Sequence, residues 1–119
     1  MQREPEAFLW DVQDDACQRI ARYTHGLDFD AYAANDLVRS AVERQLEIIG
    51  EALSQLSKLD PAMAGRIPEH RQIIAFRNVL IHGYAALDNR RVWREAEQGL
   101  PHLARVIDLL LAEAKPPQP

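Results

Sequence analysis

The chain contains 119 residues, of which 47% are hydrophobic and 27% are charged, and its formal net charge is −4. This length fits one ordinary globular domain with a buried core and leaves little room for a second. The negative balance argues against a generic duplex binder, which would carry a basic stripe, and the one cysteine excludes an internal disulfide and a cysteine-rich zinc site.

The sequence shows no signal peptide and no apolar run long enough to span a bilayer, so we expect a cytoplasmic protein without membrane contact. Residues 1–115 are predicted to form one helical domain, and the proline-rich residues 116–119 a disordered tail. Few aromatic residues (7%), only five glycines and no alternating β-branched runs favour helices over strands.

The first predicted helix begins near Pro5, a residue that suits the first turn of a helix. It ends before His25-Gly26, where glycine allows a C-terminal stop. Cys17 lies in the apolar stripe of this helix and is expected to be a small core residue.

The second predicted helix has the most regular pattern. Asn35 or Asp36 caps it, and it extends to about Lys58. Its apolar stripe consists of Leu37, Val38, Ala41, Val42, Leu46, Ile49, Leu53 and Leu56. Gly50 lies in the middle of the helix, where glycine costs about 1 kcal/mol relative to alanine. Close approach of another helix is the usual reason for such a glycine.

Three glutamates, Glu43, Glu47 and Glu51, lie four residues apart on this second helix. The simplest interpretation is a solvated face that Arg39 and Arg44 partly neutralise. A second interpretation places Glu51 at the edge of an active site or of a partner's contact surface. The sequence leaves both interpretations open.

The second half of the chain is also helical. Residues 60–67 form a turn-rich connection, after which Pro68-Glu69 opens a third helix that ends at Gly83. The apolar surface of this helix is wider than one stripe, which is typical of a helix that is central in its bundle or lies at a subunit interface. A fourth helix is predicted near 88–99 and a last one after Pro101. The predicted fold is an all-α, up-and-down bundle of four or five helices.

The segment Arg77-Asn78-Val79-Leu80-Ile81-His82-Gly83-Tyr84 places polar side chains in an otherwise apolar helix. Buried polar groups need partners, so this placement indicates a function. Arginine supplies a permanent, planar cation for a phosphate, and histidine exchanges a proton near neutral pH. Together these side chains can cleave RNA without a metal ion.

In such a site, His82 would be the general base on a ribose 2′-hydroxyl or the acid toward the leaving oxygen, and Arg77 would bind the scissile phosphate. Asn78 would orient the imidazole or a phosphate oxygen, and Tyr84 would stack a base or donate a hydrogen bond. On a regular helix Arg77 and His82 lie about 140° apart. Two copies at a two-fold axis, or a helix loosened at His82-Gly83, would bring them together.

The plainer alternative is that these side chains are helix caps, surface charges and satisfied core edges. His25, His70 and His102 lack metal-ligand spacing, and the sequence has no phosphate loop, nucleophile elbow or acidic metal cluster. We therefore expect neither a metal site nor a bound cofactor.

The motif from Arg77 to Tyr84 resembles the signature of the HEPN superfamily, R-x4–6-H with a polar residue after the arginine. Its trailing tyrosine makes it similar to the HepT-like toxin ribonucleases. Residues 41–52 are similar to the second-helix signature of that family. The resemblance spans residues 5–112 and includes the spacing to Ile67-Pro68, Val92-Trp93 and Leu100-Pro101.

This resemblance implies a homodimer of helical bundles with a cleft of Arg77 and His82 at its interface, supported by Asn78 and Glu51. It implies a metal-independent endoribonuclease that acts on RNA as the toxin of a type II- or type VII-like toxin–antitoxin pair. The antitoxin would be a minimal nucleotidyltransferase of the MntA type, which silences the toxin by transferring AMP to Tyr84. The nucleotide would block RNA and repel its phosphates.

The chain departs from the family pattern at Glu69, where relatives often carry tryptophan. An acid at this position would weaken RNA affinity or alter the contact with the partner. Two other functions remain open: a non-catalytic nucleotide- or partner-binding module that docks a nucleotidyltransferase, and a purely structural helical dimer. The variant His82→Ala separates them, because it should abolish RNA cleavage only in the enzyme.

Overall fold

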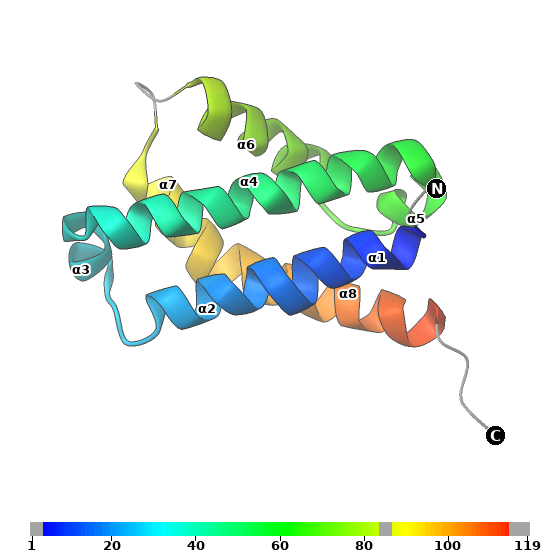
Figure 1. Cartoon of the computed structure of the whole chain (residues 1–119), viewed down its shortest axis with the longest axis horizontal. Helices are drawn as coiled ribbons and strands as arrows, with labels where there is room; N and C mark the ends of the chain where they lie inside the picture. The colour runs from blue at the N-terminus through cyan, green and yellow to red at the C-terminus, as the bar shows by residue number, and fades with distance from the viewer. Residues whose placement is uncertain (1–3, 84–86, 115–119) are drawn as a thin grey trace.

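The computed structural model describes residues 4–83 and 87–114, and every regular element within these ranges is helical (Figure 1). In chain order the elements are α1 (Pro5–Trp10), the π-helical segment η1 (Asp11–Cys17), α2 (Gln18–Thr24), α3 (Phe29–Ala34), α4 (Asp36–Leu59), α5 (Pro61–Gly65), α6 (His70–His82), α7 (Asn89–Arg94), the π-helical segment η3 (Glu95–Gly99) and α8 (Leu100–Ala114). The predicted all-α bundle is confirmed.

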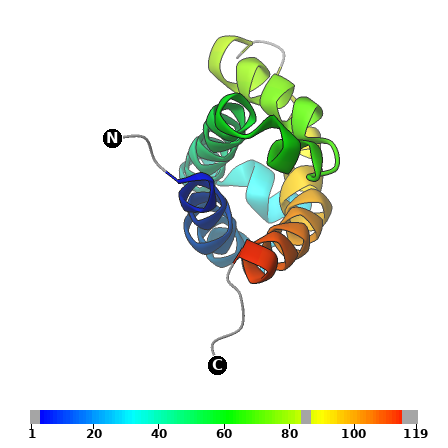
Figure 2. The same cartoon turned by 90° about the vertical axis from the view of Figure 1, so that its right-hand side faces the viewer.

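Three helical rods surround the core: α1–η1–α2, α4 and α7–η3–α8 (Figure 2). The first rod and α4 run in opposite directions, α6 returns antiparallel to α4, and α7–η3–α8 then runs in the same direction as α4 (Figure 1). This alternation in chain order is that of an up-and-down bundle. The largest fully buried side chains come from all three rods and from their connections: Leu9, Val12, Ile20, Tyr32, Val42, Ile49, Leu53, Leu56, Ile67, Val92 and Ile107. Burial of this apolar surface is the main force that holds the rods together.

Helix α4 follows its predicted bounds closely. The Asn35 side chain accepts a hydrogen bond from the Val38 N–H at 3.1 Å and so caps the helix. The predicted stripe is buried from Val42 to Leu56. Leu37 is a correction, because its side chain is 78% exposed. It lies seven residues before Arg44, so at 100° per residue it shares the charged face of α4 instead of the core face.

The first rod also ends where the sequence predicts. Helix α2 stops at Thr24, His25 leaves the helical region, and Gly26 adopts φ +78°, a conformation that glycine takes easily. Cys17 is buried, as predicted. Burial, with a smaller effect of the Asp108 carboxylate, raises the pKa of its thiol to about 12. The thiol is therefore an inert core group.

The connection between α4 and α6 contains more helix than the sequence predicts. Helix α5 begins after Asp60, whose carboxylate accepts a hydrogen bond from the Met63 N–H at 3.0 Å. Helix α6 begins at His70 and not at Pro68-Glu69, which corrects the predicted start. The reason is Glu69, which adopts φ +64° in the left-handed region and therefore cannot belong to the helix.

Helices α7 and α8 form one continuous rod, whereas the sequence predicts two separate helices. The backbone is right-handed helical at Arg94 and at Leu100, on both sides of η3. Pro101 lacks an N–H, and its ring would clash with the carbonyl four residues earlier in a regular helix. The wider turn of η3 comes directly before this proline and leaves room for the ring.

Helix α6 lies on the outer side of α4, away from the first rod (Figures 1 and 2). Among the described residues it packs mainly against α4. The interpretation that α6 is central in the bundle is therefore wrong. Several apolar side chains of α6 are only half-buried: Ile73, Ile74, Val79 and Ile81. No described helix is long and apolar enough to cross a membrane.

Candidate active site

Arg77 lies in the middle of α6, at a close approach of that helix to α4. An ideal Cβ built on Gly50 would lie 2.5 Å from Cβ of Arg77 and 3.1 Å from its Cγ. No side chain fits at such distances, so Gly50 lets the aliphatic part of Arg77 lie directly on the α4 backbone. This confirms that the glycine in α4 marks the close approach of another helix.

The guanidinium of Arg77 is held by a carboxylate from α4. Its Nη2 lies 2.8 Å from Oε2 of Glu51, and the Gln55 side-chain amide donates to Oε1 of the same carboxylate at 3.0 Å. The side chains of Arg77 and Glu51 are 28% and 47% exposed, so the ion pair contributes little to stability. Its effect is geometric, because it fixes the direction of the guanidinium.

Arg77 keeps unused hydrogen-bonding capacity. Its Nη1 donates to Oδ1 of Asn78 at 3.3 Å, which is long for a hydrogen bond. Its buried Nε has no acceptor among the described residues. A guanidinium binds a phosphate or carboxylate best through two parallel N–H groups. The Nε is buried, so an anion in the cleft would reach only the terminal Nη groups, where it would compete with Glu51 and Asn78.

A cleft of about 300 Å³ opens beside Arg77, between α6, α4 and the first rod. Its charged and polar lining consists of Asp11, Arg44, Glu47, Glu51, Gln55 and Arg77, with Phe8, Ile48, Ala52 and Ile81 as the apolar part. We name this space the Arg77 cleft. Among these lining residues, three carboxylates face two guanidinium groups, so the cleft as described is slightly acidic.

The three glutamates of α4 have three different environments. Glu47 pairs with Arg44 at 3.0 Å, as the interpretation of a neutralised surface predicts. Glu51 pairs with Arg77 of another helix. Glu43 is half-buried, and burial raises the pKa of its carboxyl; Arg39 opposes this shift and Glu47 adds to it. Glu51 thus lines the Arg77 cleft, and its place at the edge of an active site stays a prediction.

His82 is the last residue of α6, and its side chain is exposed. It is not among the residues that line the Arg77 cleft, and no hydrogen bond joins its imidazole to another described residue. Asn78 lies one turn earlier and is also exposed, but its printed contact is with Arg77. One protomer therefore does not bring Arg77 and His82 together, as expected for an ideal helix. Tyr84 lies outside the described residues.

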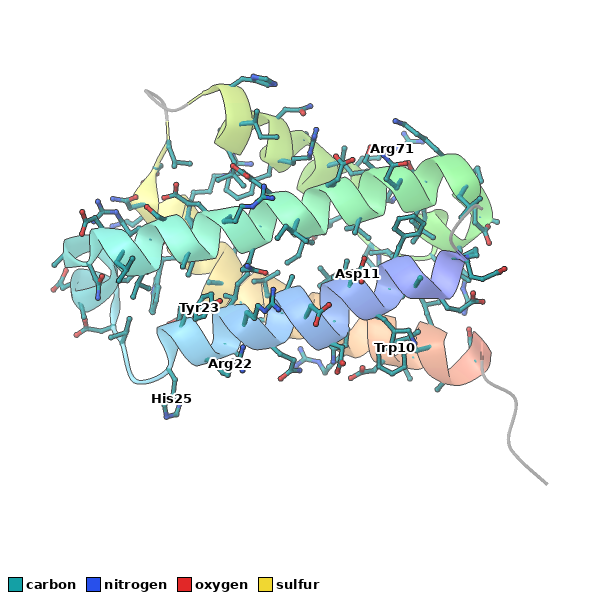
Figure 3. All side chains as sticks on the ribbon, viewed as in Figure 1. Trp10, Asp11, Arg22, Tyr23, His25 and Arg71 are labelled. Atoms are coloured by element: carbon teal, nitrogen blue, oxygen red, sulfur yellow. The ribbon has the colours of Figure 1, made fainter. Side chains whose placement is uncertain are left out.

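The structure adds two residues that the sequence did not single out. Asp11 reaches the Arg77 cleft from η1, on the side of the first rod that faces α4 (Figure 3). No sequence signal indicates this, because 66 positions separate it from Arg77. Gln55 was detectable in principle, since it follows Glu51 by four residues and such pairs meet on a helix.

Comparison with known proteins decides the family. The sequence model of the family described as Ribonuclease HepT-like matches residues 14–110. The chain belongs to this family. A protein of Methanocaldococcus jannaschii named as a candidate RNase is 28% identical over 108 residues, which cover 91% of this chain and 97% of that protein.

A second HepT-like relative is the "Probable ribonuclease HepT" of Thermococcus cleftensis. It is 30% identical over 103 residues, which cover 87% of this chain and 92% of that protein. No solved structure matches the chain. Within residues 4–83 and 87–114, no group of three or more His, Cys, Asp and Glu side chains is placed to hold a metal ion.

Proposed function

We propose that this protein is a metal-independent endoribonuclease and the toxin of a toxin–antitoxin pair. Its membership of the HepT-like ribonuclease family over residues 14–110 carries the proposal. The geometry of Arg77 supports it, because a partly exposed guanidinium at the edge of a cleft suits a phosphodiester. Glu51 and Asn78 position this guanidinium.

The proposed reaction uses histidine as the proton carrier. His82 takes the proton of a ribose 2′-hydroxyl, and the 2′-oxygen then forms a bond to the adjacent phosphorus. The bond from phosphorus to the 5′-oxygen breaks, and this leaving oxygen takes a proton from a second, protonated imidazole. Arg77 stabilises the charge that develops on the non-bridging oxygens. The products are a 2′,3′-cyclic phosphate and a free 5′-hydroxyl.

A homodimer supplies what one protomer lacks in this reaction. One copy carries a single motif histidine, and in the described protomer it lies away from the Arg77 cleft. Two copies related by a two-fold axis offer two histidines and two arginines to a shared site. The half-buried apolar side chains of α6, among them Ile74 and Ile81, suit a contact between copies.

The antitoxin in this proposal is a nucleotidyltransferase of the MntA type, and its target is Tyr84. The tyrosine oxygen attacks the α-phosphorus of ATP, pyrophosphate leaves, and the phenolic proton passes to a base of the transferase. The attached AMP adds a negative charge two residues after His82. That charge repels RNA phosphates and the nucleotide fills the space above the site.

RNA cleavage in EDTA by the purified protein tests the proposal. Wild-type protein should cleave a labelled RNA, and His82→Ala should lose at least about 100-fold in rate, which is typical for loss of a proton-transfer group. Equal cleavage by both proteins would refute the role of His82. No cleavage by the wild type, with intact binding of a nucleotidyltransferase, would favour the partner-binding module instead.

A mixing experiment tests whether the site combines two copies. Wild-type and His82→Ala proteins are unfolded together in equal amounts, refolded and assayed for cleavage. If one site needs the histidines of both copies, only dimers of two wild-type copies cleave RNA, so the activity falls to about a quarter of that of an all-wild-type sample. Activity of about a half would mean that each copy carries its own complete site.

Transfer of AMP is tested with labelled ATP and the transferase. Wild-type protein should gain one AMP, whereas Tyr84→Phe should gain none, because it lacks the attacking oxygen. Tyr23→Phe is a suitable control, since it removes the hydroxyl of a partly exposed tyrosine elsewhere in the chain. Label on a residue other than Tyr84 would refute this part of the proposal.

A further inference from the structure

The short helix α7 carries three arginines on one face. Its sequence is Asn89-Arg90-Arg91-Val92-Trp93-Arg94. Arg94 follows Arg90 by four residues and Arg91 by three, so the three side chains share a face about 100° wide. All three are exposed, whereas Val92 on the opposite side is fully buried. We name these three residues the α7 arginines.

Two of the α7 arginines are held against aromatic rings of other helices. The guanidinium carbon of Arg90 lies 4.2 Å from the ring centre of Phe29 in α3. That of Arg91 lies 4.6 Å from the ring centre of Phe76 in α6. A guanidinium placed over a ring is attracted by the ring face. Its N–H groups then point outward around the plane, where they are available to another acceptor.

Acidic neighbours of α7 are directed elsewhere. The Asp88 carboxylate accepts a hydrogen bond from the Arg90 backbone N–H at 2.9 Å and caps the helix. The carboxylate of Glu95 lies over Gly99, since its Oε2 would be 2.5 Å from a Cβ there. No ion pair joins an α7 arginine to a carboxylate in the part of the chain that the structure describes. Glu69 and Glu95 line the same cavity as Arg91, but neither is in an ion pair with it.

The α7 arginines differ in this respect from the Arg77 cleft. In that cleft both arginines are paired, Arg44 with Glu47 and Arg77 with Glu51. The α7 arginines nevertheless lie next to the motif helix. Arg91 contacts Phe76, the residue before Arg77, and α7 lies near the end of α6 that carries His82 (Figure 1).

We propose that the α7 arginines bind the phosphates of an RNA strand and hold it beside the motif helix. This inference rests on the proposed function for the identity of the strand. An acidic protein with a net charge of −4 needs a local positive surface to attract a polyanion. Guanidinium groups ordered on aromatic rings suit phosphate oxygens and stacked bases, the two parts that a single strand exposes.

Binding of an RNA that cannot be cleaved tests this proposal without catalysis. The probe is a fluorescent single-stranded oligonucleotide with 2′-O-methyl riboses, and its affinity is measured by anisotropy at several salt concentrations. The variant replaces Arg90, Arg91 and Arg94 by glutamine. Each lost phosphate contact should reduce the salt slope by about 0.7, or about 2 for three contacts. Affinity at 50 mM salt should fall by at least about tenfold.

The matched control replaces Arg19, Arg22 and Arg105, which are also exposed and lie on α2 and α8. It changes the net charge equally but removes none of the proposed phosphate contacts, so it should leave the slope close to that of the wild type. Equal losses in both triple variants would overturn the proposal, because they would reflect net charge alone. Unchanged RNA binding in the α7 variant would also overturn the proposal, and the α7 arginines would then be candidates for contact with a protein partner.

Two further measurements keep the result interpretable. Arg94→Gln has no ring contact to lose, so it should fold normally and reduce the slope by about 0.7. No change in Arg94→Gln, with a large loss in the triple variant and reduced helical circular dichroism, would indicate unfolding and contradict the proposal. Cleavage is measured separately. If the wild type binds the probe but cleaves no RNA, the proposed ribonuclease function is refuted, whereas the proposed RNA-binding surface is still supported.

Discussion

Arg77 and His82 lie on one helix, five residues apart, yet their surroundings differ sharply. Arg77 rests on the backbone of Gly50, pairs with Glu51 and lines a cleft. His82 ends the helix, and its exposed imidazole has no hydrogen-bond partner among the described residues. Contacts within the protomer therefore fix the Arg77 guanidinium, whereas they do not fix the His82 imidazole.

This difference indicates that the fold of one protomer positions Arg77 but not His82. A phosphate-binding cation must be held in place, because its effect depends on distance and direction. The contacts of α6 with α4 provide that support inside one chain. A proton carrier needs a comparable neighbour, and under the proposal a second copy supplies it. Substitution of Arg77 should then affect both the stability of the protomer and RNA cleavage, whereas substitution of His82 should affect cleavage alone.

The largest expected effect separates activity from stability. Arg77→Ala and His82→Ala should each reduce RNA cleavage at least about 100-fold. Only Arg77→Ala should also lower the thermal midpoint of the protein, because it removes packing on Gly50 and leaves Glu51 unpaired. His82→Ala should stay within about 0.5 kcal/mol of the wild type, as exposed substitutions usually do.

Thermal unfolding followed by circular dichroism checks this contrast, with cleavage measured on the same samples. A clear loss of stability in His82→Ala would contradict this comparison, because it would show that the His82 side chain makes a stabilising contact that is not seen among the described residues. Equal stability of the Arg77→Ala variant and the wild type would show that the close contact with Gly50 is dispensable.

Gly50→Ala should cost about 1–3 kcal/mol of stability, in the range of overpacked core sites. The new methyl group would collide with Cβ of Arg77 at 2.5 Å and push α6 away from α4. Gly65→Ala is the matched control, since nothing lies within 4 Å of a Cβ there. Chemical denaturation of both variants measures the difference. Equal stabilities would contradict the close approach at Gly50.

Glu43→Gln should have the smallest effect and should depend on pH. Burial raises the folded-state pKa of Glu43 above its unfolded value, near 4.3. The stability contributed by its protonated form is present below the unfolded pKa and is lost as pH rises through the folded pKa. The glutamine variant lacks this loss, so it should be more stable than the wild type at pH 7 and lose that advantage below about pH 4.

Denaturation at pH 4 and pH 7 tests this expectation, with the exposed Glu97→Gln as control. A gain in the control of the same size would assign the effect to net charge instead of burial. The result sharpens the main comparison, because Glu43 and Glu51 belong to one row on α4. Burial raises the pKa of Glu43, whereas Glu51 forms an ion pair with the motif arginine.

The sequence predicted the helical fold and much of its detail. The bounds of α4, the stop at Gly26, the burial of Cys17 and the close contact at Gly50 all follow from local signals. Errors occurred where contacts or backbone geometry override local preference. Leu37 is exposed, α6 starts after Glu69, and η3 joins two helices that Pro101 was expected to separate.

The sequence by itself determined which residues are candidates for chemistry, because the order and spacing of Arg77, Asn78, His82 and Tyr84 are local properties of one segment. Only the tertiary structure decided which of them are supported. Asp11, Glu51 and Arg77 meet in one cleft although they are far apart in the chain. Such a meeting depends on how three helices pack, and helical periodicity fixes the face of each helix but not the helix that it faces.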